Sequence, residues 1–150
     1  MARANVKHYM RLGEDITEHS VAKGPGQLSM EINWEGVLRL YRAVLRESGG
    51  EFGFVSEGTM RYIVDTLDHM EADAFAKAAF AIHEIATKHP LANGNKRLAL
   101  ALGDVLLRSE GYKVVWRLDE TVKFMLRVAR GEVSKREIED WLRARSKKTL

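Results

Sequence analysis

Two long apolar helical patterns, separated by a few residues, set the tightest limit on how this chain can fold. The first reads EADAFAKAAFAIHEIATKH, residues 71–89, and has small residues on nearly every helical face. The second reads RLALALGDVLLRSEGYK, residues 97–113. Alanine is the strongest helix former, and its small side chain lets neighbouring elements approach closely. We therefore predict two central helices joined by a short loop.

Helical spacing and capping residues predict two more helices before this pair. The first begins after Asn33, a good N-cap, and ends at Gly49 and Gly50. Ser56 is expected to cap the second. Its buried side is expected to consist of Met60, Ile63, Val64 and Leu67.

Two further helices are predicted after the central pair. Asp119 is expected to cap a helix that runs through Ala129, with Gly131 at the C′ position. Ser134 and Glu137 have the spacing of a capping box, which predicts the start of the last helix.

Only two segments have extended character. In GGEFGFVSEGT, residues 49–59, Phe52 and Phe54 alternate around Gly53, which indicates a short flap or hairpin. The segment YKVVW, residues 112–116, can form a short strand. The predicted fold class is all-α, a helical bundle of five to seven helices with a short β-hairpin flap.

Length and composition exclude several classes of protein. A chain of 150 residues is most simply one folded domain. It has no cysteine, which excludes disulfides and thiolate metal sites and fits a reducing cytosol. We find no signal peptide and no membrane-spanning run, so the expected location is cytoplasmic. The formal charge of +3 fits a solvated surface better than nucleic-acid binding, and the basic tail RARSKKTL is expected to fray.

The first residues of the chain lack a strong pattern. Gly24, Pro25 and Gly26 predict a loop, and residues 5–12 can form either a short helix or a tail that docks elsewhere. We therefore divide the chain into an N-terminal extension, residues 1–32, and one folded domain, residues 33–150.

The loop between the central helices, KHPLANGNKR, gathers an unusual set of side chains. His89 ends the first helix, while Lys96 and Arg97 fall in the first turn of the second. Cations there oppose the helix dipole, whereas a bound anion would be held by both the cations and the unpaired N–H groups. Each feature alone has an ordinary explanation, a histidine cap or a solvated Lys-Arg pair. Together they indicate a phosphate site, with His89 as a general base.

The same residues resemble a known motif. HPLANGNKR is similar to the active-site loop of the Fic/Doc (Fido) family, H-x-F-x-[D/E]-[G/A]-N-[G/K]-R, which lies between two helices. The resemblance extends more loosely over residues 33–145, and residues 49–58 fall where the family has its substrate flap. The positions in register are His89, Gly94, Asn95, Lys96 and Arg97.

The resemblance implies a transferase that moves part of ATP, with Mg²⁺, onto a hydroxyl of a target protein. It implies that His89 deprotonates this hydroxyl, that Asn95 and the loop amides, Gly94 included, form an anion hole, and that Lys96 and Arg97 hold the phosphates. Phe52, Gly53 and Phe54 would form the flap that positions the target.

Two residues favour the Doc (death-on-curing) toxins within this family. Lys96 stands where AMP-transferring members generally have Gly, and Leu100 stands where they commonly have a second arginine. Doc toxins transfer the terminal phosphate to a translation factor and are restrained by an antitoxin. The expected partners are therefore a target protein, with a translation factor as one candidate, and an antitoxin; neither a membrane nor a nucleic acid is expected.

Two positions depart from the motif. Leu91 replaces the aromatic residue and can still anchor the loop in the core. Asn93 replaces the acidic residue that holds magnesium, so it is a weak metal ligand that lacks the compensating charge. This leaves two alternatives open: an enzyme that transfers phosphate or AMP, or a weakened member that binds a nucleotide or a partner without turnover.

Overall fold

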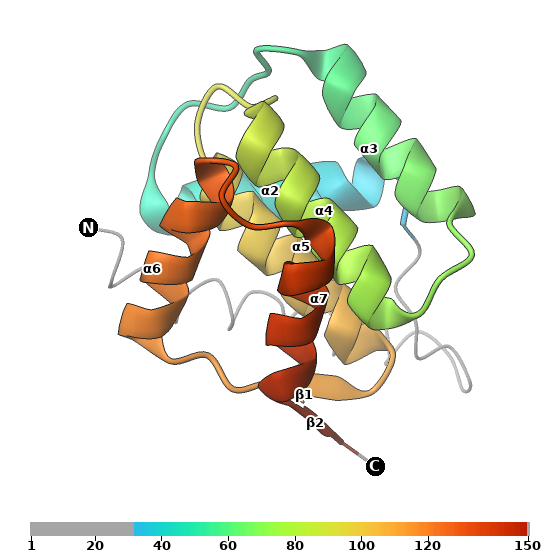
Figure 1. Ribbon diagram of the computed structural model, residues 1–150. Coiled ribbons are helices and arrows are strands. Elements are labelled where there is room, and N and C mark those ends of the chain that lie inside the picture. Colours follow the sequence, from blue (N-terminus) through green and yellow to red (C-terminus); the bar gives the residue numbers. More distant parts are fainter. Residues whose placement is uncertain (1–31, 150) are drawn as a thin grey trace.

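The computed structural model describes residues 32–149, which form six helices and two short strands (Figure 1). This mostly helical architecture confirms the predicted fold class. The loop expected at residues 24–26 and the short helix expected at residues 5–12 lie outside the described residues. None of the helices in residues 32–149 combines the length and apolar character needed to cross a membrane. In chain order the elements are α2 (Trp34–Ser48), α3 (Glu57–His69), α4 (Ala74–Lys88), α5 (Asn95–Ser109), β1 (Tyr112–Val114), α6 (Leu118–Ala129), α7 (Lys135–Ala144) and β2 (Ser146–Lys148).

The two predicted central helices, α4 and α5, pack against each other at the middle of the bundle (Figure 1). Small residues make this close approach possible. A Cβ atom added to Gly103 of α5 would lie 2.7 Å from Cδ1 of Ile82 and 3.9 Å from Cβ of Ala78, both in α4. The remaining helices cover this pair, with α3, α6 and α7 against α4 and α2 against α5. The core thus fixes the end of α4 relative to the start of α5.

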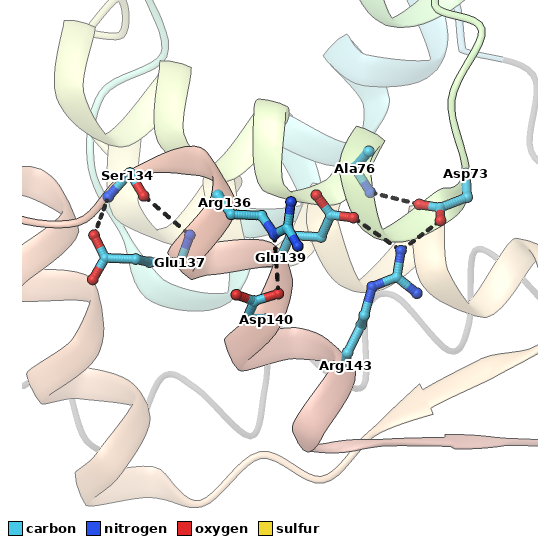
Figure 2. A network of polar contacts seen from close by, with 8 residues as sticks. All are labelled: Asp73, Ala76, Ser134, Arg136, Glu137, Glu139, Asp140 and Arg143. Carbon is cyan, nitrogen blue, oxygen red and sulfur yellow. Dashed lines mark hydrogen bonds and ion pairs between the residues drawn. The ribbon is translucent and has the colours of Figure 1, made fainter.

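Four helices begin at side-chain caps of the expected kind. Asn33 accepts the N–H of Gly36 at 2.8 Å, and Ser56 caps α3 in the same way. Ser134 and Glu137 form the predicted capping box at the start of α7 (Figure 2). These contacts satisfy backbone N–H groups that have no partner inside the helix. Asp73 caps the central helix α4.

The start of α6 differs from the prediction. The helix begins at Leu118 after Arg117, which gives no side-chain cap, so the assignment of Asp119 as the cap was wrong. The N–H of the fully buried Thr121 donates to the carbonyl of Arg117 at 2.8 Å, so the first helical turn is already complete there. Asp119 instead lies in the first turn, where a carboxylate favours the helix dipole.

The prediction that the basic tail frays is wrong, because its residues 146–148 form a strand. Residues Ser146–Lys148 form β2, which pairs antiparallel with β1 and places Lys147 opposite Lys113. Beyond the strand, Thr149 donates its N–H to the carbonyl of Gly111 at 2.7 Å. The reason is that α7 ends beside β1, whose backbone groups need partners that the tail supplies.

An ionic network fastens α7 to the beginning of α4. Arg143 of α7 contacts Glu139 at 2.9 Å and reaches the carboxylate of Asp73 at 2.5 Å (Figure 2). The Ala76 N–H, followed by Arg143, holds the pKa of Asp73 below its ordinary value. The opposite end of α4 is His89, where the candidate site begins.

Candidate active site

The loop that joins α4 to α5 begins with a strained residue. His89 has φ 49° and ψ 54°, and it is the one non-glycine residue in 32–149 with a positive φ. This left-handed conformation costs an ordinary L-residue about 1–2 kcal/mol. The His89 N–H still caps α4 by donating to the carbonyl of Ile85 at 3.2 Å, and the residue is exposed. Strain of this kind is typical of functional sites.

Buried contacts hold the loop down directly after His89. Leu91 is only 1% exposed, so it anchors the loop in the core, as its apolar character predicted. The side chain of Asn95 brackets the backbone of this residue: Oδ1 accepts the Leu91 N–H at 2.9 Å, and Nδ2 donates to the Leu91 carbonyl at 3.0 Å. The carboxamide of Asn95 therefore shapes the loop, and residue 95 can meet an anion through its backbone N–H at the start of α5.

The flap lies directly against this loop. The N–H groups of Val55 and Ser56 donate to the carbonyl of Pro90 at 2.8 and 3.0 Å, and Ala92 donates to the carbonyl of Gly53 at 2.9 Å. Within residues 32–149 the flap forms a single antiparallel bridge, Phe54 to Leu91, in place of a hairpin folded on itself. The backbone groups of this segment find their partners in the loop and not in one another.

The two flap phenylalanines face different surroundings. Phe54 packs between the rings of Trp34 and Tyr41, at centroid distances of 5.4 and 5.9 Å. Phe52 contacts Tyr41 at 5.0 Å and lies under the guanidinium group of Arg42, yet 44% of it remains exposed. Phe54 thus fixes the flap, while Phe52 offers an aromatic surface to a molecule that binds there.

Tyr41 is a site residue that the sequence analysis missed. Its hydroxyl oxygen lies 3.0 Å from the carbonyl oxygen of Gly53 and 2.9 Å from that of Asn93, so one O–H group bridges the flap and the loop. The rest of the side chain is buried. Tyr41 is one of the buried residues of α2, and a buried tyrosine usually finds a partner for its hydroxyl, but no local pattern indicates which groups those partners are.

Asn93 offers little to a metal ion. Its Oδ1 accepts the Glu51 N–H at 3.1 Å, and its Nδ2 donates to the carbonyl of Ala92. No group of three or more His, Cys, Asp or Glu side chains that could hold a metal occurs in residues 32–149. The loop therefore gives Mg²⁺ one neutral oxygen that is already partly used, a poor fit for an ion that usually takes one or two carboxylates together with phosphates.

The two cations of the motif differ in how they are held. Lys96 is exposed and makes no ion pair within the described part of the chain. Arg97 is half-buried and reaches the end of α2, where Nη1 donates to Oγ of Ser48 and, at 2.8 Å, to the carbonyl of Gly49. Both partners are neutral, so the charge of Arg97 is not cancelled by them. Gly94, at φ 85°, starts α5 beside this guanidinium group.

The predicted motif residues thus lie in the loop and the first turn of α5, and the flap packs on the loop. A comparison with family descriptions matches residues 31–107 to the Fic/DOC family. Among curated proteins, no sequence is similar enough to count as a relative. The family match covers just over half of the chain and includes the flap, the loop and helices α2 to α4 with most of α5. The chain therefore belongs to the Fic/DOC family, which supports a transferase of the Fic type.

Proposed function

We propose that the protein transfers a phosphate, or alternatively AMP, from ATP to a hydroxyl group of a target protein. One observation carries the proposal. A loop fixed between two central helices presents the exposed, left-handed His89 next to the start of α5 and two cations, Lys96 and Arg97. Neither cation has a carboxylate partner in residues 32–149, so both remain available for phosphate oxygens.

The residues of the loop divide the reaction between them. The target hydroxyl approaches His89, whose imidazole takes the proton as the oxygen attacks phosphorus. A new O–P bond forms and the bond to the leaving group breaks, which releases ADP if the γ phosphorus is attacked and pyrophosphate if the α phosphorus is attacked. The charge on the transferred group meets the N–H groups at the start of α5, including that of Asn95, together with Lys96 and Arg97.

Magnesium would arrive with the nucleotide. When bound, it neutralises phosphate charge, and Oδ1 of Asn93 is the loop oxygen that would hold it. Because this oxygen is neutral and accepts the Glu51 N–H, we assign no step of the reaction to the metal. The same observation favours a second candidate function, a weakened member that binds a nucleotide or a partner without turnover.

The choice of phosphate over AMP rests on two positions. Lys96 is exposed at the start of α5, where its flexible cation can reach a terminal phosphate. Leu100 is 4% exposed and packs in the core. A second arginine, which AMP-transferring members commonly have at that position, is therefore replaced here by a core residue. By the same resemblance we propose a toxin that acts on a translation factor and is restrained by an antitoxin.

The target is proposed to lie along the flap. Gly53 and Phe54 hold the flap on the loop, and the exposed ring of Phe52 provides the contact surface. An extended segment of the target placed there would bring its hydroxyl group close to the loop that begins at His89.

Labelled ATP tests the proposal directly. The purified protein is incubated with a cytosolic extract and with ATP labelled at either the α or the γ position. Label from γ alone identifies phosphate transfer, and label from α alone identifies AMP transfer. His89→Ala should abolish either signal. Absence of both labels, with ATP binding retained and unaffected by His89→Ala, would contradict the transferase and support the binding function.

A further inference from the structure

Ser48, the last residue of α2, lies far from the loop motif in sequence but contacts its arginine. We propose that Ser48 is a positioning residue, which fixes the Arg97 guanidinium so that its Nη2 edge is presented to the anion site. This inference rests on the proposed function, because it assumes that Arg97 meets phosphate oxygens.

The contacts of Arg97 divide its donors into two sets. The two hydrogens of Nη1 are used by Oγ of Ser48 and the carbonyl of Gly49. Nη2 lies on the loop side: it is 3.2 Å from where a Cβ atom would stand on Gly50 and 3.5 Å from where one would stand on Gly94. In the described part of the chain, Nη2 and Nε have no acceptor. Three N–H groups therefore remain for an anion beside the start of α5.

The hydroxyl of Ser48 is itself held in one orientation. It donates its hydrogen to the carbonyl of Val44, one turn back along α2, at 2.7 Å. Since that hydrogen is used, the oxygen is left as an acceptor, which suits the N–H of Arg97. The guanidinium group is thus fixed by a hydroxyl that cannot turn without losing a second hydrogen bond.

Arg97 is held by two neutral groups, which explains why a serine suits position 48. Ser48 Oγ and the Gly49 carbonyl lie at the negative end of the α2 dipole, which attracts a cation without a full opposite charge. A carboxylate at position 48 would also hold Arg97, but it would cancel the charge that a phosphate needs. The guanidinium group of Arg97 is therefore held in place by groups that do not neutralise its positive charge.

Three substitutions at Ser48 separate these contributions. Ser48→Ala removes the hydroxyl and should weaken ATP binding roughly tenfold, as expected for a charge-assisted hydrogen bond. Ser48→Thr keeps the hydroxyl and should restore binding. Ser48→Asp should keep Arg97 fixed and still weaken binding. Thr66→Ala is the matched control, because Thr66 donates its hydroxyl to the carbonyl of Tyr62 in the same way but has no hydrogen bond to an arginine in residues 32–149.

The dissociation constant of ATP is measured for each variant, and the ¹⁵N side-chain spectrum of Arg97 is recorded without nucleotide. In the wild type and in Ser48→Thr, the Nη1 hydrogens should give distinct, slowly exchanging signals that are lost in Ser48→Ala. The pH profile of transfer should not move. Alanine is a better helix former than serine, which offsets part of the stability lost with the two hydrogen bonds of Ser48, so the melting temperature should change little.

Failure of the inference can be told apart from failure of the proposed function. If the wild type transfers label and Ser48→Ala matches it in ATP affinity and in the Arg97 spectrum, the role of Ser48 is refuted and the transferase stands. A fall in affinity that Ser48→Thr does not reverse, together with a lower melting temperature, would show a merely structural role and also refute it. If the wild type neither transfers label nor binds ATP, the proposed function fails, while the spectrum alone still decides whether Ser48 fixes Arg97.

Discussion

His89 has a reactive imidazole side chain and a backbone conformation that lowers the stability of the fold. Its left-handed φ of 49° is one that glycine adopts freely and other residues adopt at a cost. A glycine at this helix end would be the ordinary choice for stability. The presence of histidine is therefore explained by its side chain, which supports its proposed role as the base.

Replacing His89 should therefore affect activity and stability differently. Both His89→Gly and His89→Ala should abolish transfer, since both remove the imidazole. His89→Gly should nevertheless be more stable than His89→Ala by about 1 kcal/mol, because only glycine relieves the left-handed conformation. Urea unfolding of the two variants measures the difference. Equal stabilities would mean that the conformation of residue 89 is not strained.

Asn93 lies at the position where the family motif has an acidic residue. Asn93→Asp places a charge where the family motif has one, and a carboxylate oxygen can still accept the Glu51 N–H that Oδ1 accepts now. We expect tighter binding of Mg²⁺-ATP and transfer raised about tenfold, equivalent to 1.4 kcal/mol. A magnesium titration of the transfer rate checks this, with Asn93→Ala as the control that lacks the oxygen. Unchanged or slower transfer in Asn93→Asp would contradict the metal argument.

The motif residues could be located from the sequence, but their partners could not. The spacing from His89 to Arg97 indicates the position of the candidate site, because these residues lie in one continuous stretch of sequence. The contacts of Arg97 with Ser48 and of Tyr41 with Asn93 join residues 49 and 52 positions apart. Such pairs depend on how α2 packs on α5, which no local pattern specifies.

Among the elements, α2 does the most to position the site. Tyr41 and Ser48 are seven residues apart, so they lie on the same face of the helix, two turns from each other. The hydroxyl of Tyr41 bridges the flap and the loop, and the hydroxyl of Ser48 accepts a hydrogen bond from Arg97. The helix therefore sets the distance between the flap, where the target is proposed to bind, and the anion site.

Tyr41→Phe tests this arrangement, because it removes the hydroxyl and keeps the ring. The carbonyl groups of Gly53 and Asn93 lose their shared donor, which should lower stability by about 1 kcal/mol. The looser flap should raise the KM for the target protein several-fold, while ATP affinity stays nearly constant. Steady-state kinetics with each substrate varied in turn provide the measurement. A change in ATP affinity alone would show that the hydroxyl serves the anion site and not the flap.

At the scale of elements, local signals predicted most of the fold and failed where distant contacts decide. Caps at Asn33, Ser56 and Ser134 could be read because each side chain bonds a backbone group three residues away. The basic tail was mistaken for a frayed end, since β2 forms only because α7 returns the chain to β1. Asp119 has the chemistry of a cap, but the first turn of α6 begins before it, because the N–H of Thr121 donates to the carbonyl of Arg117.

Across the whole molecule, α4 separates the ionic network from the site. Its fifteen residues span about 22 Å, with the N-cap Asp73 at one end and the C-cap His89 at the other. Arg143 joins α7 to the first end only. Changes in this network should therefore alter stability and leave the geometry of the loop intact.

Three carboxyl groups make stability depend on pH. Hydrogen bonds lower the pKa of each: the Ala76 N–H and then Arg143 for Asp73, Arg145 for Glu120, and the Ser134 N–H for Glu137. Because folding lowers these pKa values, their stabilising effect is complete above the unfolded-state values of 3.8 for Asp and 4.5 for Glu. It is lost as the pH falls through the lower values of the folded state.

Asp73→Asn isolates one part of this dependence. Asparagine is as good an N-cap as aspartate, so α4 keeps its first turn, but the charge that Arg143 contacts is gone. At pH 7 the variant should be slightly less stable than the wild type. The two should converge as the pH falls from 3.8 through the lower pKa of Asp73 in the folded state, because Asp73 then becomes protonated in the wild type as well. Burial lowers the pKa of His83, which adds a loss of stability below pH 6.5 that is common to both proteins and cancels in the comparison.

Urea unfolding from pH 7 to pH 2.5 measures both curves, and transfer at pH 7 serves as the control that the loop is unaffected. A constant difference over the whole range would show that the Asp73 charge makes no contribution and that only its capping role matters.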